Sequence, residues 1–157
     1  MRAAGDRLTL ALLDYPAPVV IAATGHAMAK AAFMLLLADY RLGTEGDYRV
    51  SLNEVAIGMT MHHAGIVIAR HRMPAPYFYR SVVNAEIFNP ETAIAAGFLD
   101  EIVAPEQLAE RATAVATQMK QLNMRAHKQT KLKTKAAYLE KLDWCIEQDA
   151  AHFDVLG

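Results

Sequence analysis

The chain has 157 residues, 54% of them hydrophobic, so it is long enough to bury a core of single-domain size. Its net charge of −1 gives no electrostatic support for a nucleic-acid surface. A single cysteine, Cys145, excludes an internal disulfide, and no apolar run approaches the length of a membrane span. We therefore expect a cytoplasmic protein that contacts neither nucleic acid nor membrane.

The first third of the chain predicts a helix, a strand and a second helix. Residues 8–13 have the pattern of a helix end, which Asp14 and two prolines stop. The β-branched run 19–23 predicts a strand covered on both faces, and residues 27–38 are apolar almost all round, which predicts a buried helix. A helix that directly follows a strand directs free backbone N–H groups at the space above the strand end, and such a position binds anions.

The rest of the chain alternates strand and helix signals. We expect short strands at 40–43 and 48–50, helices at 64–72 and 75–83, an edge strand within 98–103, an amphipathic helix at 107–122, and one or two helices over 125–153. Asn89, Pro90 and Glu91 form a strong helix start, and Gly97 is a favoured helix end. The alternation predicts an α/β fold. With one clearly buried strand, the sequence looks like the later part of a larger fold.

Four segments, in their order and spacing, resemble the crotonase superfamily, which is also called the enoyl-CoA hydratase/isomerase family. They are residues 18–41, with the turn Gly-His-Ala at 25–27 and the helix end Ala-Asp-Tyr-Arg at 38–41; residues 53–58, Asn-Glu-Val-Ala-Ile-Gly; residues 89–103; and the tail with Arg-Ala-His at 125–127 and Lys131.

The resemblance implies a crotonase-like (ClpP/crotonase) spiral core of ββα units that is incomplete at its N-terminus, because family members begin with further strands. We expect a partial core at 1–106 and a C-terminal helical region of the trimerisation type at 107–157. It also implies an acyl-CoA substrate and a homo-oligomer, either a trimer or a dimer of trimers.

Family enzymes polarise the thioester carbonyl of an acyl-CoA with two backbone N–H groups, which form an oxyanion hole. By the resemblance, residues 29–31, Ala-Lys-Ala, replace three glycines of the family turn, so the backbone N–H of Lys30 is one of the two donors. The other donor comes from the region that precedes residue 1. The Lys30 side chain has three interpretations: near the thioester, near a CoA phosphate, or facing solvent.

The resemblance also assigns the acid/base group. Two-carboxylate hydratases carry their first glutamate where this chain has Phe33, and their second glutamate matches Glu54. A lone glutamate resembles the family's Δ3-Δ2 enoyl-CoA isomerases, in which one base moves a proton between carbons. Apolar neighbours would raise the pKa of Glu54 by desolvation. The alternative is that Glu54 is a surface or structural acid.

Four further residues are candidate contacts to substrate or CoA: Ala29, Phe33, His62 and Lys131. For the basic run that contains Lys131, the alternative is a solvated helix face. The histidines have no recognised ligand spacing, so we expect no metal. No cofactor is expected either, since coenzyme A arrives as part of the substrate.

Two alternatives to single-glutamate isomerisation stay open. One is hydration of an enoyl-CoA, which the family also carries out. The other is a non-catalytic homologue that binds CoA esters or assembles with other subunits, in which Phe33 and the Ala-Lys-Ala segment mark a lost active site.

Overall fold

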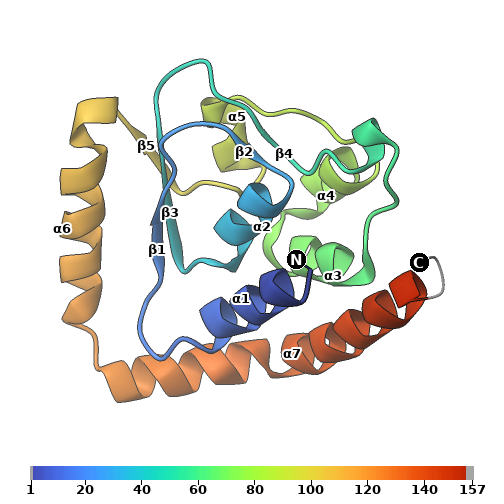
Figure 1. The fold of residues 1–157 in the computed structure, drawn as a ribbon. Helices are drawn as coiled ribbons and strands as arrows, with labels where there is room; N and C mark the ends of the chain where they lie inside the picture. The colour runs from blue at the N-terminus through green and yellow to red at the C-terminus, as the bar shows by residue number, and fades with distance from the viewer. Residues whose placement is uncertain (1, 155–157) are drawn as a thin grey trace.

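The computed structural model describes residues 2–154 and contains two small parallel sheets surrounded by helices (Figure 1). In chain order the elements are α1 (Arg2–Asp14), β1 (Val20–Ala22), β2 (Ala27–Met28), α2 (Lys30–Leu37), β3 (Tyr40–Thr44), β4 (Val50–Ser51), the 3-10 turn η1 (Val55–Ile57), α3 (His63–Arg72), α4 (Ala75–Val82), α5 (Pro90–Ala95), β5 (Glu101–Val103), η2 (Pro105–Gln107), α6 (Leu108–Lys120) and α7 (Met124–Asp154).

The first sheet has the strand order β1-β3-β5, with all neighbours parallel. Helix α6 packs on one face of this sheet, where Leu42 of β3 forms an apolar cluster with Leu108 and Val115. The strand expected at 19–23 is confirmed as β1, but its full coverage is not. Its three residues are half-buried or exposed, because β1 lies at an edge of the sheet.

The second sheet pairs β2 with β4 in parallel, with Ala27 opposite Val50 and Met28 opposite Ser51. The sequence predicted strands at 40–43 and 48–50 and a helix from residue 27. The two strands exist, but they belong to different sheets. The helix begins only at Lys30, because residues 27 and 28 are extended and hydrogen-bonded to β4.

Helix α2 lies at the centre of the fold, and its buried face carries Phe33 and three leucines at 35–37. It contacts α1 and α3, while α3 also packs along α7 (Figure 1). The expectation of a buried helix is therefore confirmed. Helix α7 is one continuous helix, which settles the choice between one and two helices over 125–153.

The local signals around residues 89–103 are also confirmed. Oδ1 of Asn89 accepts a hydrogen bond of 2.8 Å from the backbone N–H of Thr92 at the start of α5. Gly97 follows the helix with φ of +86°, and a Cβ at this position would lie 2.9 Å from Cδ of Pro74. Strand β5 then forms the other edge of the first sheet.

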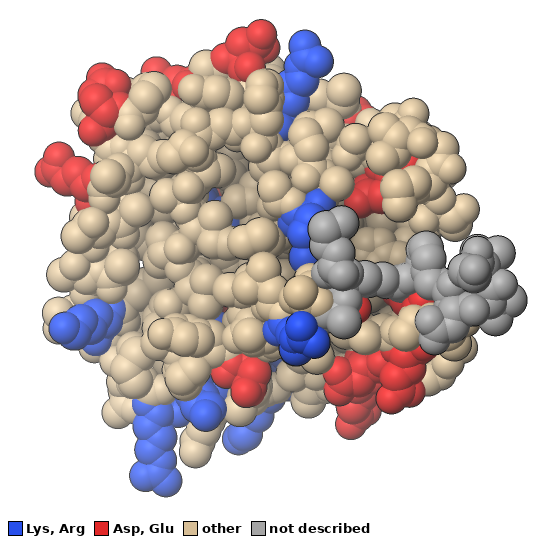
Figure 2. Space-filling view, in the orientation of Figure 1, with Lys and Arg blue, Asp and Glu red and all other residues tan. Residues whose placement is uncertain are grey.

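Charge is unevenly distributed along α7. Its first half carries Arg125 and four lysines, whereas its second half carries most of its acids. Figure 2 shows a group of basic side chains at the lower left of the molecule and a group of acidic ones at the lower right, with further acidic side chains at the upper left. Among the described helices, none has the length and apolar character needed to cross a membrane.

Candidate functional site

The parallel pairing of β2 and β4 brings two of the candidate residues to the same edge of the second sheet. The chain leaves β2 toward Lys30 and leaves β4 toward Glu54. The backbone N–H of Ala29 donates a 3.0 Å hydrogen bond to the carbonyl of Ser51, which continues the pairing past the end of both strands. Because parallel strands end on the same side, the start of α2 and Glu54 lie near each other.

The start of α2 presents backbone donors at this edge. Helix geometry leaves the first N–H groups, including that of Lys30, without a partner in the preceding turn. Ala29, which precedes the helix, has φ of +49° and ψ of −118°, a conformation that favours glycine. Its side chain has no group that could cap the helix, so the N–H groups stay available to an oxyanion.

The Lys30 side chain turns to α1. Its ammonium donates hydrogen bonds to Oγ1 of Thr9 (2.8 Å) and to the carbonyl of Gly5 (3.1 Å). Burial lowers the pKa of Lys30, and the charge of Asp6 partly opposes this effect. The lysine is exposed, which agrees with the solvent-facing interpretation, and its ammonium is also hydrogen-bonded to the neighbouring helix.

Glu54 is buried, with 7% of its surface exposed. Its Oε2 atom has no hydrogen-bond partner among the described residues. Burial raises the pKa of this carboxyl group, and its own backbone N–H lowers it to a smaller extent. Glu54 is therefore not a surface acid, and the missing partner distinguishes it from a structural ion-pair carboxylate.

The segment after Glu54 borders an apolar cavity that the sequence did not reveal. It has a volume of about 490 Å³ and is lined mainly by valine, methionine and isoleucine side chains between residues 55 and 83. Three large apolar side chains of this region, Val55, Met59 and Val83, are about half exposed. A cavity of this composition can hold a hydrocarbon chain.

Phe33 packs inside the protein next to His62. Its side chain is 1% exposed, and the two rings meet edge to face with centroids 5.2 Å apart. A Cβ on Gly65 would lie 2.8 Å from Cζ of Phe33, which shows how closely this group is packed. With so little of its surface exposed, Phe33 belongs to the packed core of this structure, and its assignment as a substrate contact stays a prediction.

Lys131 lies far from Glu54, beyond the opposite end of α2. Its ammonium is 2.5 Å from Oδ2 of Asp39, and the lysine is 7% exposed. Asp39 follows the C-terminal end of α2, an eight-residue helix that rises about 12 Å. The structure thus gives Lys131 a structural partner. Within the described part of the chain, no three His, Cys, Asp or Glu side chains form a group that could hold a metal ion.

Residues 1–156 match the family model described as enoyl-CoA hydratase/isomerase. An enoyl-CoA hydratase/isomerase family protein from Pseudomonas syringae is 55% identical, with a TM-score of 0.92 over 94% of this chain and 64% of that chain. A Mycobacterium tuberculosis protein is 41% identical. One of its structures is named a probable enoyl-CoA hydratase (TM-score 0.91; 97% and 64% covered), and another an enoyl-CoA isomerase (0.89; 94% and 65%).

Human mitochondrial Δ3-Δ2-enoyl-CoA isomerase has the same fold at 23% identity, with a TM-score of 0.89 over 96% of this chain and 58% of that chain. The chain spans 64% to 65% of the length of the P. syringae and M. tuberculosis proteins. The mixed α/β architecture with parallel sheets is that of the crotonase fold in N-terminally incomplete form.

Proposed function

The chain belongs to the enoyl-CoA hydratase/isomerase family, the crotonase superfamily, and we propose that it acts on acyl-CoA thioesters by moving a double bond from C3 to C2. Glu54 is the single acid/base. The backbone N–H of Lys30 is one donor to the thioester oxygen. Coenzyme A is part of the substrate, and the proposed mechanism requires no other cofactor.

One observation carries this proposal: the carboxylate of Glu54 is buried, and one of its oxygens has no partner among residues 2–154. A buried carboxylate without a partner destabilises the fold, and proteins retain such features mainly at functional sites. Its raised pKa brings it toward the range in which a general base works at neutral pH.

The proposed reaction is a proton transfer with no net change in atoms. Glu54 removes a proton from C2 of the 3-enoyl thioester, and the electron pair moves to the carbonyl oxygen to give a dienolate. The N–H of Lys30 donates a hydrogen bond to this oxygen, which strengthens as the negative charge develops. The protonated Glu54 then returns the proton to C4, and the double bond forms between C2 and C3.

Isomerisation fits these residues better than hydration. Hydration needs a base that activates water and an acid that protonates the carbon, and Phe33 stands where the resemblance places the first of two glutamates. Its buried phenyl ring, packed on His62, can neither hold nor activate a water molecule. The apolar cavity that begins next to Glu54 would receive the acyl chain.

Product analysis tests this choice. The full-length protein is given a 3-enoyl-CoA and a 2-enoyl-CoA in separate reactions, and the products are separated by chromatography. We expect 2-enoyl-CoA from the first substrate and little 3-hydroxyacyl-CoA from the second. Faster hydration than isomerisation would reject the proposal in favour of the hydratase. Tight binding of both CoA esters without turnover would favour the non-catalytic homologue.

A further inference from the structure

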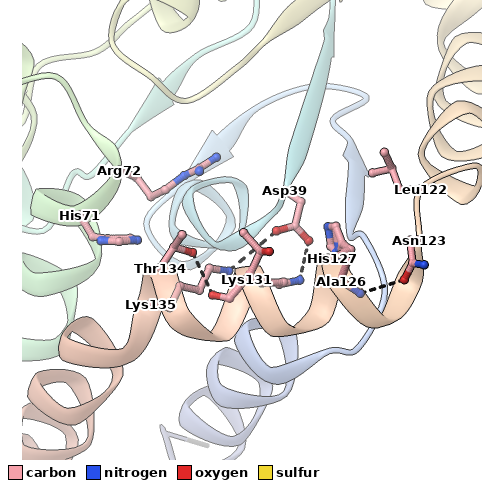
Figure 3. A pocket seen from close by; sticks show the side chains of 11 residues that line it. Asp39, His71, Arg72, Leu122, Asn123, Ala126, His127, Lys131, Thr134 and Lys135 are labelled. Atoms are coloured by element: carbon pink, nitrogen blue, oxygen red, sulfur yellow. Dashed lines mark hydrogen bonds and ion pairs between the residues drawn. The ribbon is translucent and has the colours of Figure 1, made fainter.

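A second cavity, of about 560 Å³, lies where α3, α7 and the segment between α6 and α7 meet. Figure 3 shows side chains from these elements pointing toward a common space, with Asp39 above it. Asp39 follows α2, whereas Lys30 begins it, so the eight-residue helix separates this cavity from the start of α2. The function proposed above uses none of its residues.

Positive charge exceeds negative charge around this cavity. Arg72, Lys131 and Lys135 line it, and among its lining residues Asp39 is the one carboxylate. Asp39 is already engaged: Oδ2 is 2.5 Å from the ammonium of Lys131 and accepts the N–H of Val19, and Oδ1 lies 3.8 Å from the ammonium of Lys135. Among the described residues that line the cavity, two positive charges are therefore left without a matching anion.

A nearby carboxylate does not remove this excess. Asp100 acts electrostatically on Arg72. Both of its oxygens, however, are bound by the guanidinium of Arg41, at 2.6 Å from Nη2 and 2.8 Å from Nε. Arg41 and Asp100 thus form a neutral pair of their own.

Two buried nitrogens of the cavity also lack hydrogen-bond partners among the described residues. The guanidinium of Arg72 donates from Nη2 to the carbonyl of Ala38 at 3.1 Å, and its buried Nε has no partner among the described residues. Nδ1 of His127 is buried without a partner as well. Burial lowers the pKa of Lys135, and the charges of Lys131 and Arg72 lower it further, against the opposing effect of Asp39.

We propose that this cavity binds a phosphate-type dianion, at a site separate from Glu54. A doubly charged tetrahedral oxyanion matches the two uncompensated positive charges and offers acceptors to Lys135 and to the Nε–H of Arg72. Arg72 comes from α3 and Lys135 from α7, so a bound anion joins the two helices at this end of the fold (Figure 3). The volume of the cavity exceeds that of a phosphate ion. The site therefore has room for the phosphate group of a larger molecule as well as for free phosphate.

Calorimetric titration of the full-length protein with inorganic phosphate, at fixed pH and ionic strength, tests the proposal. We expect one saturable site. Lys135→Gln should raise the Kd about tenfold, the effect of losing one charge-assisted contact, whereas Lys135→Arg should largely retain binding. Lys133→Gln is the matched control, since Lys133 is exposed on the same helix. Circular dichroism checks that each variant is folded. If Lys135→Gln is not folded, the binding measured for Lys135→Arg still tests the proposal.

A second titration with a nucleoside monophosphate distinguishes the two sources. Tighter binding than phosphate indicates the phosphate group of a larger molecule, and equal binding indicates the free anion. The proposal is overturned if phosphate gives no saturable binding, or if Lys133→Gln weakens it as much as Lys135→Gln. Equal losses of CoA and phosphate affinity in Lys135→Gln would place the anion in the substrate site and would also overturn it.

Discussion

The ammonium of Lys30 lies 2.8 Å from Oγ1 of Thr9, so the residue that begins α2 is tied to α1 through its side chain. The same residue offers its backbone N–H at the edge of the second sheet where Glu54 lies. The lysine that the resemblance places where the family has a glycine is therefore compatible with the site, since its side chain turns away and binds the neighbouring helix.

Thr9→Val should lower the free energy of unfolding by about 1 kcal/mol, because the ammonium of Lys30 loses an acceptor while it stays partly desolvated. Thr113→Val is the matched control: both threonines donate to the carbonyl four residues earlier, at 3.0 and 2.9 Å, but Thr113 is exposed and has no lysine partner. Urea unfolding measures both. Equal losses would show that the contact to Lys30 contributes nothing.

Ala29→Gly should raise the free energy of unfolding by about 1 kcal/mol. Ala29 has φ of +49°, where a Cβ is strained, and glycine adopts this conformation without that cost. Ala31→Gly, two residues later in the first turn of α2, should have the opposite effect because it removes a good helix former. Thermal unfolding compares the two, and a destabilised Ala29→Gly variant would argue against strain at this turn.

Local signals made several elements predictable from the sequence. The apolar composition of residues 27–38 predicted the buried helix α2, and Asn89 with Pro90 predicted the start of α5. Each of these signals is contained in a single continuous stretch of the sequence. The pairing of β2 with β4 was not predictable in this way, because two-residue strands show no periodicity and their register depends on residues 23 positions apart.

The site was less predictable than the fold, since a segment that resembles the family contains both functional and structural residues. Lys131 and Asp39 belong to segments that resemble the family, yet their side chains form a buried ion pair across 92 positions of the sequence. The structure distinguishes such residues from Glu54 by their hydrogen-bond partners. The Oε2 atom of Glu54 is buried and has no partner among the described residues. The apolar cavity was missed because its lining comes from separate segments, residues 55–66 and 82–83.

Phe33→Glu should not create a hydratase, although it restores a carboxylate at the position that the resemblance assigns to one. The side chain is 1% exposed and packs on His62, so a glutamate there would bury an unpaired charge and cost about 3 kcal/mol or more. Phe33→Leu, which stays apolar, should cost only about 1 to 2 kcal/mol. Unfolding curves and a hydration assay check this, and a stable variant that hydrates 2-enoyl-CoA would contradict it.

Glu54→Gln should stabilise the fold at neutral pH, by an amount on the order of 1 kcal/mol, because it removes a buried charge. Burial raises the folded-state pKa above its ordinary value of 4.5, so the folded state holds a proton that the unfolded state releases first. The stability of the native protein should therefore fall as pH rises above about 4.5, and the advantage of Glu54→Gln should shrink below it. An advantage that does not depend on pH would contradict this assignment.

The most direct test of the account is the rate at which the full-length protein converts a 3-enoyl-CoA to the 2-enoyl-CoA, compared with Glu54→Gln. Glu106→Gln serves as the control, since Glu106 is an exposed acid in η2. If Glu54 is the single acid/base, its variant should lose about 100- to 10,000-fold in kcat, while the control keeps the native rate. Equal rates in the native protein and in Glu54→Gln would contradict the proposed mechanism.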